Sequence, residues 1–276
     1  MKLIYKNRIT RGLYIRLFPK SLFASRTHLN QSPEALLFPP RGVGLIWSAK
    51  SACTTSILWY LAVAGLLKEA LAYDSWPHRY RTEVLPKTDF YRTWLLNTDP
   101  RQLTWVRVIR DPYKRAVSSF RHILRYTGDQ NYHFSKDLIL DPTQVRLSFD
   151  SFLSRIEGVD ITNCNNHYRQ QFHPLEQSIR PARVINADRE PLLHALLDFA
   201  APTTDARQRL EEEISRISLF HHAHRSLNHE DFSAYPFSIS NVSQDWPEYE
   251  SFLNDSTRRK IERIYAADFS AYSEFL

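Results

Sequence analysis

Glycine is scarce in this chain, and its scarcity excludes two familiar phosphate-binding loops. Only six of the 276 residues are glycine, whereas the dinucleotide-binding pattern G-x-G-x-x-G needs three in a fixed frame. Gly42 and Gly44 supply the first two, but Trp47 stands at the third position. The Walker A pattern G-x-x-x-x-G-K-[ST] is also absent, because Ala49 precedes Lys50-Ser51. A phosphate-rich ligand would therefore need a different loop.

Cysteines and long apolar runs are also few. The two cysteines, Cys53 and Cys164, provide no disulfide framework, which favours a reducing compartment. The longest apolar run, Ile57 to Leu67, has eleven residues, fewer than the roughly 20 that a membrane-spanning helix needs. The N-terminus has no uninterrupted apolar segment of the kind that signal peptides contain. These features lead us to expect a cytoplasmic protein.

The net charge of +6 is concentrated at the N-terminus. Seven cations precede Glu34 with no acidic residue among them, and the rest of the chain has 29 basic against 30 acidic residues. A nearly neutral body argues against a nucleic-acid partner. The leading segment also contains many apolar residues, so two interpretations are open: peripheral contact with an anionic membrane, or packing on the body with the cations in water. We assign residues 1–38 to this basic and apolar arm and residues 39–276 to one domain.

Two strand–loop–helix units are expected. The apolar run Val43–Trp47 predicts a buried strand, and the segment from Cys53 to about Leu67 predicts a helix. Leu103–Ile109 predicts a second strand, and Asp111-Pro112 is a typical helix start. That helix should run to about Tyr126. Further helices are expected at 148–157, 188–199, 204–218 and 255–269, with a strand at 183–186. This alternation predicts an α/β fold with a mostly parallel sheet.

Two strand ends carry groups that suit an anion. Ligands of parallel α/β sheets bind at the carboxyl ends of strands. The first end leads into Lys50-Ser51-Ala52-Cys53-Thr54-Thr55, which offers a cation, hydroxyl groups and the N–H donors of a helix N-terminus. The second offers Arg110, with Ser118 about two turns into the next helix. A ligand with two separated phosphate-like groups would match both.

These motifs resemble those of the sulfotransferases that use 3′-phosphoadenosine 5′-phosphosulfate (PAPS). Residues 47–55, Trp-Ser-Ala-Lys-Ser-Ala-Cys-Thr-Thr, are similar to the family's 5′-phosphosulfate loop, and Val108–Phe120, with Arg110-Asp-Pro and Ser118, resembles its 3′-phosphate motif. The likeness is closest to the carbohydrate sulfotransferases. His167-Tyr-Arg-Gln-Gln171 resembles their His-Trp-x-Pro-Gln segment, with Tyr and Gln in place of Trp and Pro, and the chain's ending is similar to their closing helix.

The resemblance implies a P-loop-kinase-like central parallel sheet flanked by helices, and PAPS as the co-substrate. It also implies transfer of a sulfuryl group to a hydroxyl or amine of a glycan or glycolipid, with no metal. Lys50 would stabilise charge on the departing phosphate. The loop residues Ser51, Ala52, Cys53, Thr54 and Thr55 would bind the donor together with Arg110 and Ser118. The acceptor also needs a general base, for which His167 is the candidate.

Alternatives from other classes stay open. A nucleotide-dependent kinase has a related fold, but the Walker A glycines and an obvious magnesium-binding carboxylate after Thr55 are lacking. A non-catalytic module could bind an anionic glycan or lipid through the basic arm. The histidines at 221, 222, 224 and 229 raise the question of a metal site, but their spacing fixes no ligand geometry and we expect none. Lys114, Arg121 and Arg125 share a helix face with Ser118, as a solvated face or as cations that steer the donor. Neither the oligomeric state nor the acceptor can be read from these patterns.

Overall fold

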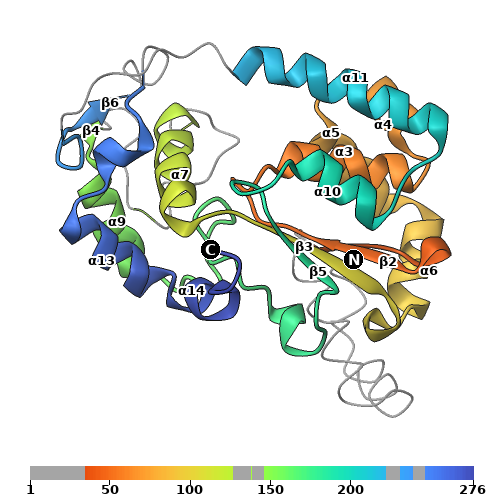
Figure 1. Ribbon diagram of the computed structural model, residues 1–276, viewed down its shortest axis with the longest axis horizontal. Coiled ribbons are helices and arrows are strands. Elements are labelled where there is room, and N and C mark those ends of the chain that lie inside the picture. The colour runs from red at the N-terminus through yellow and green to blue at the C-terminus, as the bar shows by residue number, and fades with distance from the viewer. Residues whose placement is uncertain (1–34, 127–137, 139–145, 222–230, 239–245) are drawn as a thin grey trace.

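A mixed four-stranded sheet lies at the centre of the computed structural model, which describes residues 35–126, 138, 146–221, 231–238 and 246–276 (Figure 1). Its strands are β1 (Ala35–Phe38), β2 (Val43–Ile46), β3 (Thr104–Ile109) and β5 (Arg183–Asn186). Their spatial order is β1-β2-β3-β5. The pairs β2–β3 and β3–β5 are parallel, whereas β1 is antiparallel to β2. The predicted α/β class, with parallel strands flanked by helices, is therefore confirmed.

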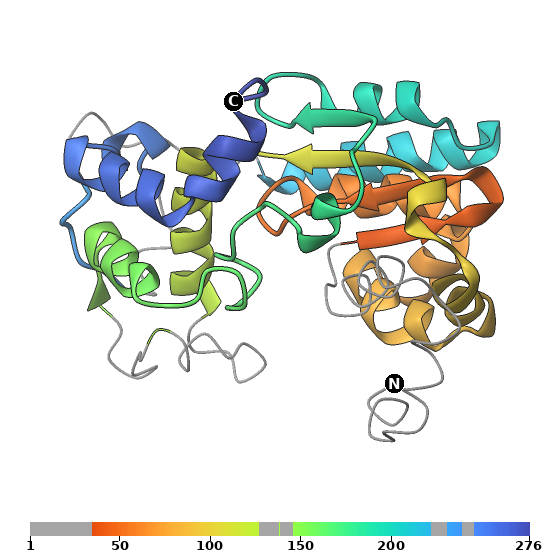
Figure 2. The ribbon, with the colours of Figure 1, turned by 90° about the horizontal axis from the view of Figure 1, so that it is seen from below.

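Both faces of the sheet are buried under other elements. Alternate residues of each strand point to opposite faces, so each strand contributes side chains to both. Leu36 and Leu45 pack with the apolar side chains of α3 (Cys53–Val63), α10 (Leu192–Phe199) and α11 (Thr204–His221). Leu37 and Ile46 face the other side, where partly buried residues of α6 (Asp89–Asn97) pack against them. Figure 2 shows helices on both sides of the sheet. Strands covered in this way read as continuous apolar runs, which is why β2 and β3 could be predicted.

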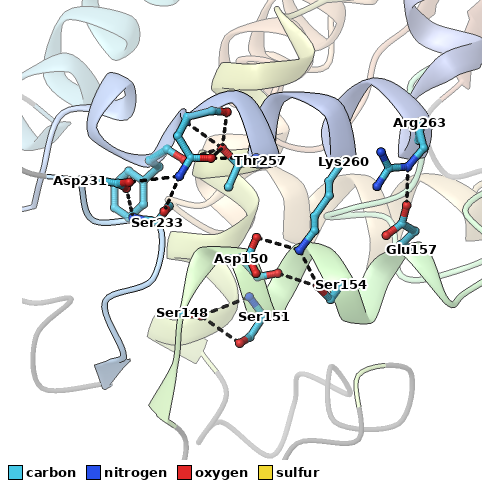
Figure 3. A network of polar contacts seen from close by, with 12 residues as sticks. Ser148, Asp150, Ser151, Ser154, Glu157, Asp231, Ser233, Thr257, Lys260 and Arg263 are labelled. Carbon is cyan, nitrogen blue, oxygen red and sulfur yellow. Dashed lines mark hydrogen bonds and ion pairs between the residues drawn. The ribbon is translucent and has the colours of Figure 1, made fainter.

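A second group of helices packs beside the sheet, around an aromatic core. It consists of α7 (Pro112–Tyr126), α9 (Phe149–Glu157), α13 (Asp255–Ile264) and α14 (Ala266–Tyr272), with a small antiparallel pair of strands, β4 (Arg146–Leu147) and β6 (Phe237–Ser238). Phe120, Phe149, Phe152 and Phe252 are fully buried there. Ion pairs join α13 to α9, from Lys260 to Asp150 at 2.7 Å and from Arg263 to Glu157 at 2.8 Å (Figure 3). Pairs that stay partly exposed, as both of these do, add little stability, so the aromatic core holds these helices together.

The helix after β2 is shorter than predicted. It ends at Val63, because Gly65 adopts a left-handed conformation with φ of 72°. The N–H of Leu66 donates to Leu61 O at 2.8 Å, and that of Gly65 donates to Ala62 O at 3.1 Å, the pattern of a glycine-terminated helix. The chain continues through α4 (Leu67–Tyr73), α5 (Pro77–Arg79) and a single π turn at Tyr80–Val84. The apolar run thus spans the end of one helix and the start of the next.

The predicted starts of α7 and α9 are confirmed because both are encoded locally. The Asp111 side chain accepts from the N–H groups of Tyr113 and Lys114, at 2.8 and 3.2 Å, and Pro112 is the first helical residue. Ser148 caps α9 by accepting from the N–H of Ser151 at 3.1 Å. Capping of this kind satisfies N–H groups that a helix leaves without partners.

Other predicted boundaries were wrong where tertiary contacts or proline intervened. The helix predicted from 188 begins at Leu192, because Pro191 disfavours a helical conformation of the residue before it. The closing helix is broken at Tyr265, whose fully buried hydroxyl donates to Tyr168 O at 2.8 Å. Residues 35–38, which we assigned to the arm, form β1 and belong to the sheet. The rest of that arm, residues 1–34, lies outside the described residues, so the division into arm and domain stays a prediction. None of the helices in the described ranges combines the length and hydropathy of a membrane span.

Candidate functional site

The loop between β2 and α3 has a strained backbone. Lys50 and Ala52 adopt left-handed conformations with φ of 68° and 53°, and neither is glycine. Such conformations cost about 1–2 kcal/mol each for an L-residue and often mark functional loops. Ala52 is the N-cap residue of α3, and no side chain caps this helix. The N–H groups of its first turn, which includes the partly buried Thr54 and Thr55, are therefore available to an anion.

Arg110 lies at the end of β3, beside this loop. Its Nη1 donates to Lys50 O at 3.3 Å, and its Nε contacts the Asp188 carboxylate at 3.3 and 3.4 Å. Asp188 also accepts from the N–H of Asp111 at 3.1 Å and lies 3.9 Å from the Lys114 ammonium. The parallel pairing of β2 and β3 explains why both predicted anion motifs lie at one sheet edge.

Gln171 connects the two motifs through its side chain. Its Oε1 accepts from the Ser51 hydroxyl and from the backbone N–H of Arg110, both at 2.9 Å, and its Nε2 donates to Arg110 O at 2.8 Å. The backbone N–H of Gln171 donates to the buried Asp268 carboxylate at 2.7 and 2.8 Å. One buried amide thus sets the distance between the Lys50 loop and the end of β3.

Two buried arginines donate hydrogen bonds to the residues just before Lys50. Arg115 of α7 donates to Ala49 O at 3.0 Å and to Arg169 O at 2.6 Å. Arg107 of β3 donates to the Ser48 hydroxyl at 2.9 Å and also to Gln171 O. The backbone around the loop is therefore held by charge-assisted hydrogen bonds, which are stronger than neutral ones. This rigidity would preorganise the loop for a ligand.

The carboxylates near these two arginines, Glu176 and Asp268, lie far from them in the sequence. Arg107 lies 3.4 Å from Glu176, and Tyr272 donates to Glu176 at 2.7 Å. Burial raises the pKa of Asp268, while Arg115 and the backbone N–H groups of Gln171 and Phe172 oppose that shift. These polar groups are distant in sequence and meet only in the folded protein.

His167 lies next to the loop with one ring nitrogen engaged. Its Nδ1 is 2.9 Å from Asn165 Oδ1, and its ring stacks on that of His122 with centroids 4.1 Å apart. Because the Asn165 oxygen can only accept, it places the proton of a neutral His167 on Nδ1 and leaves Nε2 as the basic nitrogen. Burial, followed by the charges of Lys50 and Arg115, lowers the pKa of His167 to about 3. Burial and Lys50 likewise lower the pKa of His122 to about 2.

Lys50 lies among other cations. Burial lowers its pKa to about 8 although part of its side chain is exposed; Cys53 opposes this shift, while Arg110, Arg121 and Arg125 add to it. Of these arginines, Arg110 has the carboxylate of Asp188 beside it. Within the described residues, Lys50, Arg121 and Arg125 form no ion pair with a carboxylate. An uncompensated positive field of this kind attracts an anion.

The structure brings most of the predicted site residues together. Lys50, Ser51 and Arg110 are linked by the hydrogen bonds described above, and His167 lies near enough to Lys50 for that ammonium to lower its pKa. Cys53 is the partly buried first residue of α3. Ser118 lies on α7, partly buried, and its hydroxyl has no hydrogen-bond partner in the described part of the chain. Its neighbour Ser119 is buried and bonds to His167 O at 2.6 Å.

Sequence reasoning missed several of the polar groups here. Gln171 stood in the quoted segment without a role, and the others carried no local signal: Asn165, His122, Arg107, Arg115, Asp188 and Asp268. Among the residues that the structure describes, no three His, Cys, Asp or Glu side chains are grouped as a metal site. The histidines at 222, 224 and 229 lie outside the described residues, and the side chain of His221 is not described.

Comparisons with known proteins add no relative to this picture. A scan against protein-family models, a search of curated proteins and a search of solved structures each found no match.

Proposed function

We propose that this protein is a sulfotransferase of P-loop-kinase-like fold that moves a sulfuryl group from PAPS to a hydroxyl or amine of a glycan or glycolipid. The observation that supports it best is the meeting of two anion motifs 60 residues apart in sequence, Lys50 and Arg110, at one sheet edge. A donor with a 3′-phosphate and a 5′-phosphosulfate requires two such sites. The strained loop, the uncapped helix and the Lys50 ammonium, which has no carboxylate partner among the described residues, all favour an anionic ligand.

Each residue then has a defined task. The first-turn N–H groups of α3 and the Lys50 ammonium hold the phosphosulfate, and Arg110 with Ser118 holds the 3′-phosphate. PAPS supplies the activated sulfuryl group. Lys50 stabilises the negative charge that develops as the bond between sulfur and the bridging oxygen breaks. Positioning of donor and acceptor in line contributes the rest of the acceleration.

His167 takes the proton of the acceptor hydroxyl through Nε2. In the ligand-free protein this imidazole is neutral but a weak base, because its pKa is about 3. Lys50 is one cause of that low value, so neutralising Lys50 with a bound anion raises the basicity of His167. Donor binding and activation of the base are thus coupled through one ammonium group. His167→Ala should abolish most of the turnover of labelled PAPS while leaving donor affinity unchanged.

The donor site has a direct test in titration calorimetry with 3′-phosphoadenosine 5′-phosphate, the expected product. The native protein should bind it, and Arg110→Ala and Ser118→Ala should each weaken binding, by roughly tenfold or more for the arginine. Arg101→Ala is the matched control, because Arg101 is exposed at the opposite end of β3 and pairs with Asp99. Binding of ATP without binding of this nucleotide would indicate a kinase. Glycan binding without either nucleotide would indicate a non-catalytic module.

A further inference from the structure

Two pairs of aromatic rings lie near Lys50, and we call them together the row. At one end, the indole of Trp76 is 47% exposed and its ring centroid lies 4.8 Å from that of His78. At the other end, His122 of α7 stacks on His167. His78 is close enough to His167 to lower its pKa, and Lys50 lowers the pKa of both His122 and His167. The row therefore runs from the start of α5 to α7, close to Lys50 and His167.

The α7 end of this row carries two cations that the donor does not require. Arg121 and Arg125 lie one and two turns beyond Ser118, or about 4.5 and 10.5 Å farther along the helix axis. Arg121 is partly buried over the Trp246 ring at 5.4 Å, and Arg125 is exposed. Neither forms an ion pair with a carboxylate of the described residues. At the start of the helix, by contrast, Asp188 forms ion pairs with Arg110 and Lys114. Two adjacent guanidinium groups without a carboxylate partner in the described part of the chain favour an anionic ligand of their own.

The chemistry of this surface differs along its length, and this limits what can bind there. The exposed indole face offers apolar contact to a flat ligand, and Nε2 of the neutral His167 is the acceptor that the proposed reaction uses. A pyranose ring matches both, because it has an apolar C–H face and hydroxyl groups around its rim. An acidic peptide would pair with the arginines, but its carboxylate side chains have no apolar face to pack on the indole.

We propose that the acceptor is an acidic saccharide, with one sugar ring on Trp76 and a carboxylate or sulfate group held by Arg121 and Arg125. This inference rests on the proposed function and adds the charge and the orientation of the acceptor. The hydroxyl to be sulfated then lies between these two anchors, next to Lys50 and His167. These arginines do not exclude a neutral saccharide. Preference for an acidic saccharide therefore comes from the attraction between the arginines and its negative group.

The test measures binding of defined probes to the full chain by calorimetry, with and without saturating 3′-phosphoadenosine 5′-phosphate. The probes are a glucuronate-containing tetrasaccharide, the neutral tetramer of N-acetylglucosamine, and tetraglutamate. The acidic tetrasaccharide should bind at least roughly tenfold more tightly than the other two. R121Q/R125Q should remove that preference, and Trp76→Ala should weaken binding of the acidic tetrasaccharide more than Trp76→Phe does. R207Q/R216Q removes the same charge from α11 and should have no such effect.

The outcomes separate this inference from the proposed function. If R121Q/R125Q instead weakens nucleotide binding tenfold, the arginines belong to the donor site and the inference fails. Equal binding of neutral and acidic tetrasaccharides also overturns it, as does tighter binding of tetraglutamate. Failure of the native protein to bind the nucleotide overturns the proposed function, but the saccharide measurements without nucleotide still decide the charge of the ligand.

Discussion

The stacked pair His122 and His167 should make the protein sensitive to acid, and His122→Phe should relieve part of that sensitivity. Burial lowers the pKa of His122 to about 2, so the imidazole stays neutral in the folded protein at pH values where the unfolded chain binds a proton. Between these two pKa values the unfolded state binds more protons, so stability falls as the pH drops below about 6.5. The contribution is complete near neutral pH and is lost progressively towards pH 2.

The magnitude follows from the difference between about 6.5 and the working pH. At a pH of about 5 this difference is about 1.5 pH units, which corresponds to about 2 kcal/mol for one histidine. Phe keeps an aromatic ring beside His167 and Tyr126, whose centroids lie 4.1 and 4.6 Å from that of His122, but it cannot be protonated. The free energy of unfolding of the variant should therefore fall by about 2 kcal/mol less than that of the native protein between pH 7.5 and 5.

Urea unfolding of both proteins at the two pH values measures this difference directly. Comparing variant with native protein cancels the titration of all other groups, including Asp268, whose raised pKa acts in the opposite direction. His194→Phe, on the exposed side of α10, tests whether loss of any histidine gives the same result. An equal loss of stability in native protein and His122→Phe would refute the reasoning.

Four further changes have expected outcomes. Gln171→Leu leaves buried donors without an acceptor, at about 1–3 kcal/mol each, and thermal unfolding should show the loss, whereas an unchanged melting temperature would contradict the proposed link. Gly44→Ala should cost about 3 kcal/mol or more, because its Cβ would lie 2.3 Å from the buried Trp105 ring. Gly65→Ala has free space but a φ of 72°, so urea unfolding should show a smaller cost of about 1–2 kcal/mol, and the reverse order would be inconsistent with this structure. The pKa of about 8 at Lys50 predicts that binding of 3′-phosphoadenosine 5′-phosphate weakens above that pH, by up to about tenfold per unit; calorimetry of Lys50→Arg should show no such decline.

Elements with a local cause could be predicted from the sequence. Apart from Arg107, strand β3 consists of apolar and β-branched residues, and α7 begins at Pro112 because Asp111 caps it. Both causes act within a few residues, so neither needs the rest of the fold. The same local reasoning failed at Gly65, which was included in the apolar run although its backbone ends α3. It also failed at β1, whose partner strand alone makes it part of the sheet.

In the candidate site, too, local features could be predicted and contacts between distant segments could not. The order of residues along the chain was enough to place Lys50 after one strand and Arg110 after the next, and parallel strands bring their carboxyl ends to one edge. It could not indicate that Gln171 would connect them or that Asn165 would orient His167. Nor could it indicate that, among the residues the structure describes, Arg121 and Arg125 would lack acidic partners. Those facts depend on contacts between segments tens of residues apart.

The sequence by itself determined the α/β class and the starts of α3 and α7, and it predicted the two anion motifs, because periodicity and capping are local properties. Only the tertiary structure decided the electrostatics of the site. Burial and neighbouring charges set the pKa values of Lys50, His122 and His167, and both are properties of the packed protein that no single segment contains.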